Sequence, residues 1–219
     1  MVRLLLPLAA WGALVVLGLP ARAELPGSAA VDTPLDRVAP TPRVVAWARD
    51  LAPVEIMNAT TREAAIVRFY GRDGEVDAGA RETFERVAAA GGPSHSFSVR
   101  VEQLVLRAAY HFNGAAVIIV SGWRDHAGRH GTGDAVDFKL RGVSAGRLAA
   151  YLRDLPRAGV GVYTHRRTQF VHLDVRDQSY HWLDASPPGV HWHEAQLRDP
   201  HAAQRDAAWR PEMDLPARP

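Results

Sequence analysis

The architecture of this chain can be worked out from Arg129-His130-Gly131-Thr132-Gly133-Asp134-Ala135-Val136-Asp137, in which a histidine precedes an aspartate by seven residues. Two glycines between them allow a tight loop, because glycine accepts positive φ and close backbone contact. From Ala135 to Leu140 the residues alternate, so Val136 and Phe138 share one side of a strand with Leu140, and Asp137 points to the other. The loop therefore delivers an imidazole and the strand delivers a carboxylate, and we expect them to meet.

A third polar group lies in a second strand-like run, Phe170-Val171-His172-Leu173-Asp174-Val175. Its alternation places His172 and Asp174 on one face of the strand. Imidazole nitrogens and carboxylate oxygens are zinc ligands, and a catalytic zinc site uses three of them and keeps one position open. His191-Trp192-His193 offers a rival third ligand, since an H-x-H pair can place two imidazoles on one strand face. We favour His172, because it follows a glycine-bounded turn in a strand-like run whereas His191 lies among prolines.

These pieces together resemble a known superfamily. His130-x-x-Gly133-x-Ala135-x-Asp137 is preceded by Ser121-Gly122-x-Arg124 and followed by Gly159-Val160-Gly161-Val162-Tyr163 and Phe170-Val171-His172-x-Asp174. The pattern is similar to the D-alanyl-D-alanine carboxypeptidase and hedgehog superfamily of zinc peptidases, and closest to small exported bacterial members that act on peptidoglycan. Two features depart from it. The family commonly has Ser where this chain has Gly128, and the segment between Arg124 and His130 is short.

The resemblance implies a zinc ion held by His130, Asp137 and His172. It also implies that Arg124 binds the peptide carboxylate or polarises the carbonyl, as suits a guanidinium fork. Ser121 either adds a hydrogen bond in the cleft or caps the strand.

For the general base we name Asp174, which shares a strand face with His172. The alternatives are that Asp174 binds the metal or orients a ligand from behind, and His165 is a weaker candidate for the base.

Residues 1–23 have the features of a secretory signal peptide. They begin Met1-Val2-Arg3, run apolar from Leu4 to Leu19 and end Ala21-Arg22-Ala23. The rival is an uncleaved membrane anchor, but an apolar run of about 16 residues is short for a bilayer span. We therefore expect cleavage after Ala23, export to the periplasm or cell envelope, and no stable membrane anchor afterwards.

Composition narrows the possible functions further. The chain has no cysteine, which excludes a lipid anchor on cysteine, disulfide bonds and thiolate zinc ligands. Residues 1–23 carry two arginines and no acidic residue, so the remainder has 24 basic and 24 acidic side chains. This balance argues against a nucleic-acid surface built on bulk charge.

The rest of the chain predicts one α+β domain with a mainly antiparallel sheet, flanked by helices and carrying the zinc site. Candidate N-caps at Asp77, Ser98 and Ser144 predict three helices, ending near residues 90, 113 and 155. Apolar runs at 116–120, 135–140, 160–163 and 169–175 predict strands. We expect a flexible leader over 24–43, the peptidase-like domain over 44–182, and a polar, proline-rich tail over 183–219 that wraps the surface or stays mobile.

The expected function is zinc-dependent hydrolysis of amide bonds in peptidoglycan stem peptides or cross-links. The alternative is a zinc-bound but inactive protein that binds the cell wall or serves as a scaffold. The departures at Gly128 and in the short loop keep this alternative open.

Overall fold

The computed structural model describes residues 47–125, 128–190 and 195–216. The expected signal peptide, the leader over 24–43, and the rival ligands His191 and His193 lie outside these residues. No helix among the described residues has the length and apolar character that a membrane span requires.

Three helices begin where the sequence predicts them, because a short polar side chain accepts a hydrogen bond from the first turn of each. Asp77 accepts from the N–H of Ala80 at the start of α2, Ala78–Ala88. Ser98 caps α3, Val99–His111, and Ser144 caps α4, Ala145–Arg153, in the same way. The predicted N-caps are confirmed.

Eight strands form one sheet in the order β2-β1-β3-β4-β6-β5-β7-β8. Their bounds are β1 Val54–Asn58, β2 Ala64–Val67, β3 Val117–Ser121, β4 Ala135–Leu140, β5 Ala158–Tyr163, β6 Phe170–Val175, β7 Tyr180–Asp184 and β8 Ala195–Gln196. The α+β class is confirmed, but the expectation of a mainly antiparallel sheet is not.

The sheet is mixed because two pairs of strands, β1–β3 and β5–β7, run parallel. The chain between β1 and β3 passes through β2, α2 and α3, which gives it the length that a parallel return requires. The short segment 176–179 carries the chain from β6 past the start of β5, so β7 joins the free side of β5. Neither path is marked by a local sequence signal.

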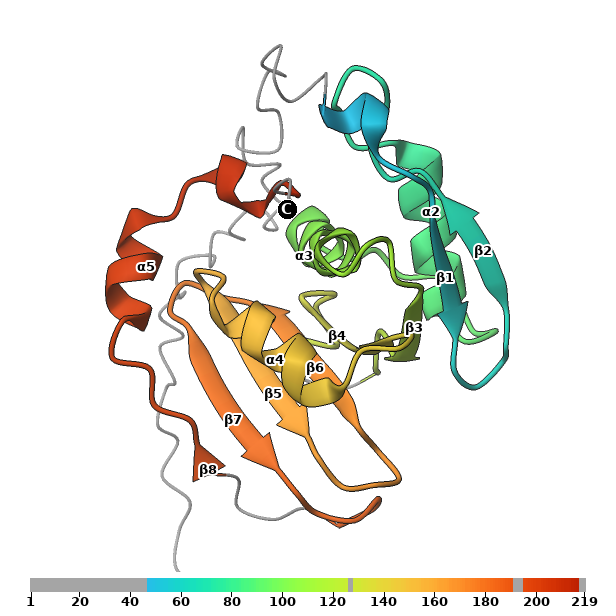
Figure 1. Cartoon of the computed structure of the whole chain (residues 1–219). Coiled ribbons are helices and arrows are strands. Elements are labelled where there is room, and N and C mark those ends of the chain that lie inside the picture. Colours follow the sequence, from blue (N-terminus) through green and yellow to red (C-terminus); the bar gives the residue numbers. More distant parts are fainter. Residues whose placement is uncertain (1–46, 126–127, 191–194, 217–219) are drawn as a thin grey trace, which may run out of the picture. The chain divides into compact units, whose positions relative to one another are not determined.

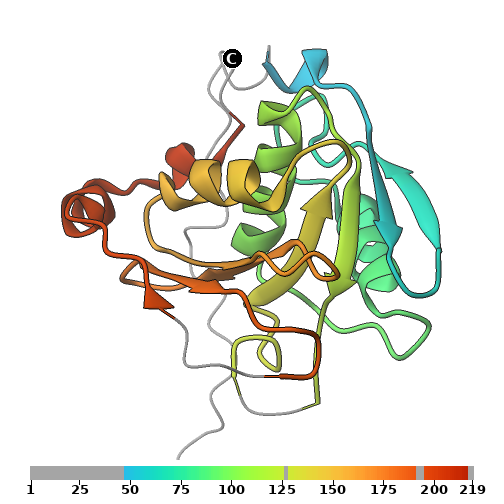
Figure 2. The same ribbon diagram turned by 60° about the horizontal axis from the view of Figure 1, so that its bottom comes forward.

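The two faces of the sheet have different environments. Figures 1 and 2 show α3 and α4 on one face, where Val136, Phe138, Val171 and Leu173 are fully buried. The alternation of β4 and β6 turns Asp137 and His172 to the opposite face. The covered face supplies the hydrophobic core, and the other face is left for polar chemistry.

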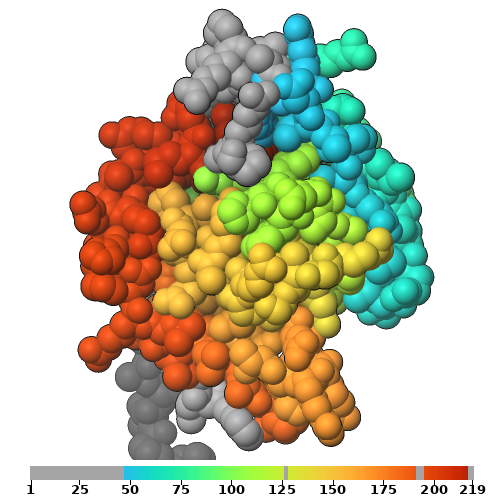
Figure 3. Space-filling model, viewed as in Figure 1, coloured from blue at the N-terminus to red at the C-terminus, as the bar shows by residue number. Residues whose placement is uncertain are grey.

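The C-terminal segment packs against this core through polar contacts. It contains α5, Ala202–Ala208, and the 3-10 helix η2, Pro211–Asp214. Arg100 of α3 donates from Nε to Asp214 at 2.7 Å, and Arg205 of α5 donates to the Arg153 carbonyl of α4 at 2.9 Å. In the space-filling view the red residues of this segment lie against the gold residues of α4 (Figure 3). Of the two arrangements considered for the tail, residues 195–216 show the wrapped one.

Candidate metal centre

The expected site lies along a single row of residues that crosses the sheet. Strand register places Ser121 opposite Asp137, Asp137 opposite His172, His172 opposite Gly161, and Gly161 opposite Trp182. Neighbours in such a row have their Cβ atoms about 4.5–5.5 Å apart. The Asp137 carboxylate on β4 and the His172 imidazole on β6 are therefore brought together by strand pairing alone.

His130 reaches the row from the loop before β4. The indole Nε1 of Trp123 donates to the Gly131 carbonyl at 2.9 Å, and the ring of His95 stacks on Trp123 with centroids 3.5 Å apart. These contacts hold the loop against the sheet, and only 5 % of His130 is exposed.

Three ligand atoms converge at the centre. His130 Nε2 lies 3.2 Å from His172 Nδ1 and 3.3 Å from Asp137 Oδ1. His172 Nδ1 and Asp137 Oδ1 are 2.9 Å apart. Tetrahedral zinc with ligand bonds of 2.0–2.1 Å would separate its ligand atoms by about 3.3 Å. The three side chains thus already have the spacing of three corners of a zinc tetrahedron.

The hydrogen bonds behind the histidines fix which ring nitrogen faces the centre as an acceptor. His130 donates from Nδ1 to the carbonyl oxygen of Gly122 at 2.7 Å, which leaves the lone pair on Nε2. His172 donates from Nε2 to Asp174 Oδ2 at 3.0 Å, which leaves the lone pair on Nδ1. Together with Asp137, three lone pairs point at one position, and such an arrangement favours a cation there.

The titration of these groups reflects the same preference for positive charge. Burial raises the pKa of Asp137, but in the absence of a metal the two histidines, when protonated on the nitrogens that face it, donate hydrogen bonds that outweigh burial and hold that pKa well below its usual range. Burial lowers the pKa of His172, whereas its hydrogen bonds to Asp137 and Asp174 raise it above the ordinary value. Asp137 is thus ionised at neutral pH, as a metal ligand must be.

Arg124 and Ser121 lie beside the carboxylate of the centre. Arg124 donates from Nε to Ser121 Oγ at 2.8 Å, and one terminal nitrogen donates to Asp137 Oδ2. The Arg124 side chain is 38 % exposed, and its other terminal nitrogen makes no hydrogen bond to a described residue. Arg124 therefore neutralises Asp137 and keeps one terminal nitrogen without a partner among the described residues.

Asp174 lies behind His172, on the side away from the three converging atoms. It is 1 % exposed, and Arg176 donates to it from Nε at 2.6 Å and from a terminal nitrogen. Arg129 approaches the same carboxylate, with Nε 3.4 Å from Oδ1. Burial raises the pKa of Asp174, but the hydrogen bonds from His172 and Arg176 outweigh burial and lower it. A buried carboxylate with both oxygens engaged is suited to orienting His172.

Two glycines on β5 make room for these side chains. A Cβ on Gly159 would lie 2.2 Å from Asp174 Oδ2, and one on Gly161 would lie 2.3 Å from the indole of Trp182. The Trp182 ring in turn lies beside His172, with centroids 5.1 Å apart. We missed this supporting role of Trp182. The Gly-x-Gly alternation of β5 was the available signal, because it leaves one face of the strand without side chains.

The remaining sequence features lie as follows. Gly128, where the family commonly has Ser, adopts a φ of +119°, a conformation that favours glycine. His165 lies in the turn between β5 and β6, where its Nδ1 accepts from the N–H of Arg167 at 3.3 Å.

Comparison with known proteins identifies the same region. The model of the family described as Peptidase M15 matches residues 88–174, which include Ser121, Arg124, His130, Asp137, His172 and Asp174. No curated protein and no solved structure matches the chain. The match over residues 88–174 places the chain in the M15 superfamily of zinc D-Ala-D-Ala carboxypeptidase-like peptidases.

Proposed function

We propose that this chain is an exported zinc peptidase that hydrolyses amide bonds in peptidoglycan stem peptides or cross-links. The observation that carries the proposal is the convergence of His130 Nε2, Asp137 Oδ1 and His172 Nδ1, with both imidazoles turned by hydrogen bonds so that lone pairs face the centre. Membership of a peptidase superfamily supports the reaction class, and the peptidoglycan substrate follows from the family resemblance.

The fit of these residues to zinc is good on three counts. The donor set is two imidazoles and one carboxylate, the separations suit a tetrahedron, and each histidine has an acceptor behind it. A zinc ion bound here would supply Lewis-acid polarisation and a water of lowered pKa. In this mechanism Arg124 binds the carbonyl or carboxylate of the peptide through its remaining donors.

For Asp174 we favour the alternative role named above over that of general base. We infer that it orients His172 and keeps the Nδ1 lone pair directed at the metal, because both of its oxygens already accept hydrogen bonds. This was the alternative to its assignment as general base. Among the described residues, Asp137 and Asp174 are the only carboxylates that hydrogen-bond to the two histidines.

The test uses purified protein with one equivalent of zinc and purified peptidoglycan. We expect cleavage to release peptide fragments with new amine and carboxylate ends, detected by chromatography and mass spectrometry. His172→Ala should abolish both zinc binding and cleavage, whereas His191→Ala should retain zinc. If His191→Ala loses the metal and His172→Ala keeps it, our choice of third ligand is wrong.

Two further results would redirect the proposal. Stoichiometric zinc without any released fragment would favour the inactive, wall-binding alternative. Export has its own test, because removal of the signal peptide predicts a mature protein that begins at Glu24, and mass spectrometry of protein from the native host measures that end.

A further inference from the structure

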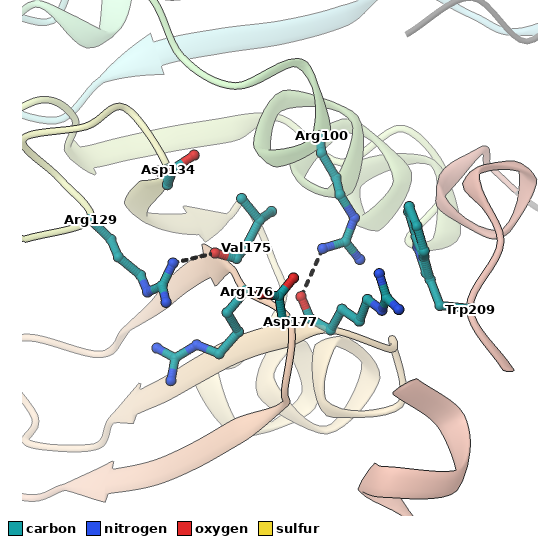
Figure 4. A pocket seen from close by; sticks show the side chains of 8 residues that line it. Arg100, Arg129, Asp134, Val175, Arg176, Asp177 and Trp209 are labelled. Atoms are coloured by element: carbon teal, nitrogen blue, oxygen red, sulfur yellow. Dashed lines mark hydrogen bonds between the residues drawn. The ribbon is translucent and has the colours of Figure 1, made fainter. Parts of the chain in front are cut away.

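A cavity of about 300 Å³ opens at the ends of the strands that carry the metal centre. Its wall contains four arginines, two aspartates and a tryptophan (Figure 4). The residues that matter below are Arg129, Arg157, Arg176, Asp134, Asp177 and Trp209. Its volume is at the lower end of the range of small-molecule sites.

The positive charges of this wall are only partly neutralised. Arg100 is committed to structure, because it donates to Asp214 and to the carbonyls of Arg157 and Pro156. Arg129 and Arg176 both approach the single carboxylate of Asp174, so two guanidinium groups share one negative charge. One positive charge at this end of the cavity is therefore left over.

Arg157 provides a second unneutralised cation. Its side chain donates from Nε to the carbonyl of Asp206 at 3.2 Å, and its terminal nitrogens form no hydrogen bond or ion pair with a described residue. Its guanidinium lies over the Trp209 ring, 4.6 Å from the centroid. Its backbone has a φ of +53°, a conformation that is unfavourable for a residue with a side chain. Contacts from Asp206 and Arg100 to the Arg157 backbone hold this conformation.

Two carboxylates in the same wall form no ion pair with a described residue. Asp134 accepts a hydrogen bond from Thr132 Oγ1 at 2.7 Å and forms no ion pair with the described part of the chain. Asp177 is exposed, and within that part it has neither a hydrogen bond nor an ion pair. The cavity thus presents separated unpaired charges of both signs beside an aromatic ring.

We propose that this cavity binds an amino-acid head group, in which an ammonium and a carboxylate sit on one carbon. The carboxylate is bound by Arg157 over the Trp209 ring, and the ammonium is bound by Asp177. A simple anion would be repelled by the two aspartates and a simple cation by the arginines. A head group with both charges matches the wall, and it belongs either to a free amino acid or to a peptide side chain that ends in such a carbon.

The position of the cavity connects such a ligand to the metal centre. Arg129 directly precedes His130, and Arg129 and Arg176 both contact Asp174, whose Oδ2 accepts from His172. These two arginines are therefore separated from His172 by one side chain, and they line the same cavity as Arg157. The head group is thus held in a cavity whose wall includes the residues that support His172.

NMR titrations of the protein loaded with one equivalent of zinc test this proposal, with alanine, alaninamide and N-acetylalanine as probes. We expect alanine to shift resonances of Arg157 and Asp177, and both derivatives to bind roughly tenfold to a hundredfold more weakly, because each lacks one charge. Arg157→Ala and Asp177→Asn should weaken alanine binding similarly. Arg166→Ala, at an exposed arginine of the β5–β6 turn, should leave it unchanged.

Several results would overturn the proposal. Alanine that causes no shift at the cavity, a derivative that binds as tightly as alanine, or Asp177→Asn with wild-type affinity would each do so. Asp177 is exposed and forms no hydrogen bond or ion pair with a described residue, so we expect Asp177→Asn to fold as the wild type does. Chelation of zinc by alanine would be equal in wild type and variants.

A second arm of the experiment distinguishes the sources of the head group. Soluble muropeptides with a side chain that ends in an ammonium and a carboxylate on one carbon would assign the cavity to a peptide if they bind more tightly than alanine and lose that affinity in Arg157→Ala. Binding of alanine alone would assign it to a free amino acid. Since no cleavage is measured, this test can fail while the peptidase proposal stands, and the reverse.

Discussion

Replacing Asp174 by asparagine tests how the metal centre is held. The amide keeps the shape of the side chain but removes the negative charge that lies between His172 Nε2 and the guanidinium groups of Arg176 and Arg129. Two effects then weaken zinc binding. His172 loses a charged acceptor and keeps at most a neutral amide oxygen, which raises its basicity less, and two arginines lose the carboxylate that neutralises them.

The magnitude follows from the role of Asp174 behind a metal ligand. Loss of such a partner costs about 10–100-fold in metal affinity, or about 1.4–2.7 kcal/mol. If Asp174 were instead the general base, the variant would keep its zinc affinity and lose about 10²–10⁴-fold in turnover. The two roles thus differ in which measurement changes.

The assay is competition for zinc with a metal-binding dye, followed by peptidoglycan cleavage at saturating zinc. The matched control is Asp214→Asn, which also removes a buried carboxylate that accepts from an arginine, but one without contact to the metal ligands. We expect the control to bind zinc as the wild type does. A zinc dissociation constant for Asp174→Asn within twofold of wild type would refute the orienting role.

Three other variants probe the surroundings of the site and the core. Gly161→Ala places a Cβ 2.3 Å from the Trp182 indole and should lower the free energy of unfolding in urea by about 1–3 kcal/mol. The control Gly146→Ala, whose Cβ meets nothing within 4 Å, should not destabilise the protein. Equal stabilities of the two variants would contradict this prediction. Arg100→Met leaves the Asp214 carboxylate buried without its main partner and should cost about 3 kcal/mol by the same measurement, and adding Asp214→Asn should recover part of that loss. Burial outweighs the Arg81 ion pair and raises the pKa of Glu102 to about 8, so the folded state holds a proton that the unfolded state releases near pH 4.3. The contribution of that proton to the free energy of unfolding is complete below about pH 4.3 and is lost as the pH rises through 8. In thermal unfolding, the wild type should therefore lose more stability between about pH 5 and 8.5 than Glu102→Gln, which has no such proton to lose.

Local signals in the sequence predicted the local structure. Asp77, Ser98 and Ser144 cap helices because their side chains accept from backbone N–H groups three residues ahead, which depends on neighbouring residues alone. The alternation around Asp137 and His172 likewise predicted which face each side chain takes, and strand pairing then brought the two together.

What depends on distant partners was not predictable. The parallel pairing of β1 with β3 rests on a path through two helices, so the sheet is mixed where we expected a mainly antiparallel one. The hydrogen bond of Arg100 to Asp214 spans 114 positions. Single polar residues of this kind leave no periodic pattern, so the packing of residues 195–216 could not be foreseen.

The two histidines of the proposed centre differ in how mutation can disturb them. His130 takes its orientation from the carbonyl of Gly122, but a Cβ at position 122 would lie 2.8 Å from the Ala88 carbonyl oxygen, so a substitution there displaces the backbone. His172 takes its orientation from Asp174, a side chain that any substitution at that position replaces. One imidazole is thus vulnerable to added bulk at a neighbouring position, and the other to the loss of a charge.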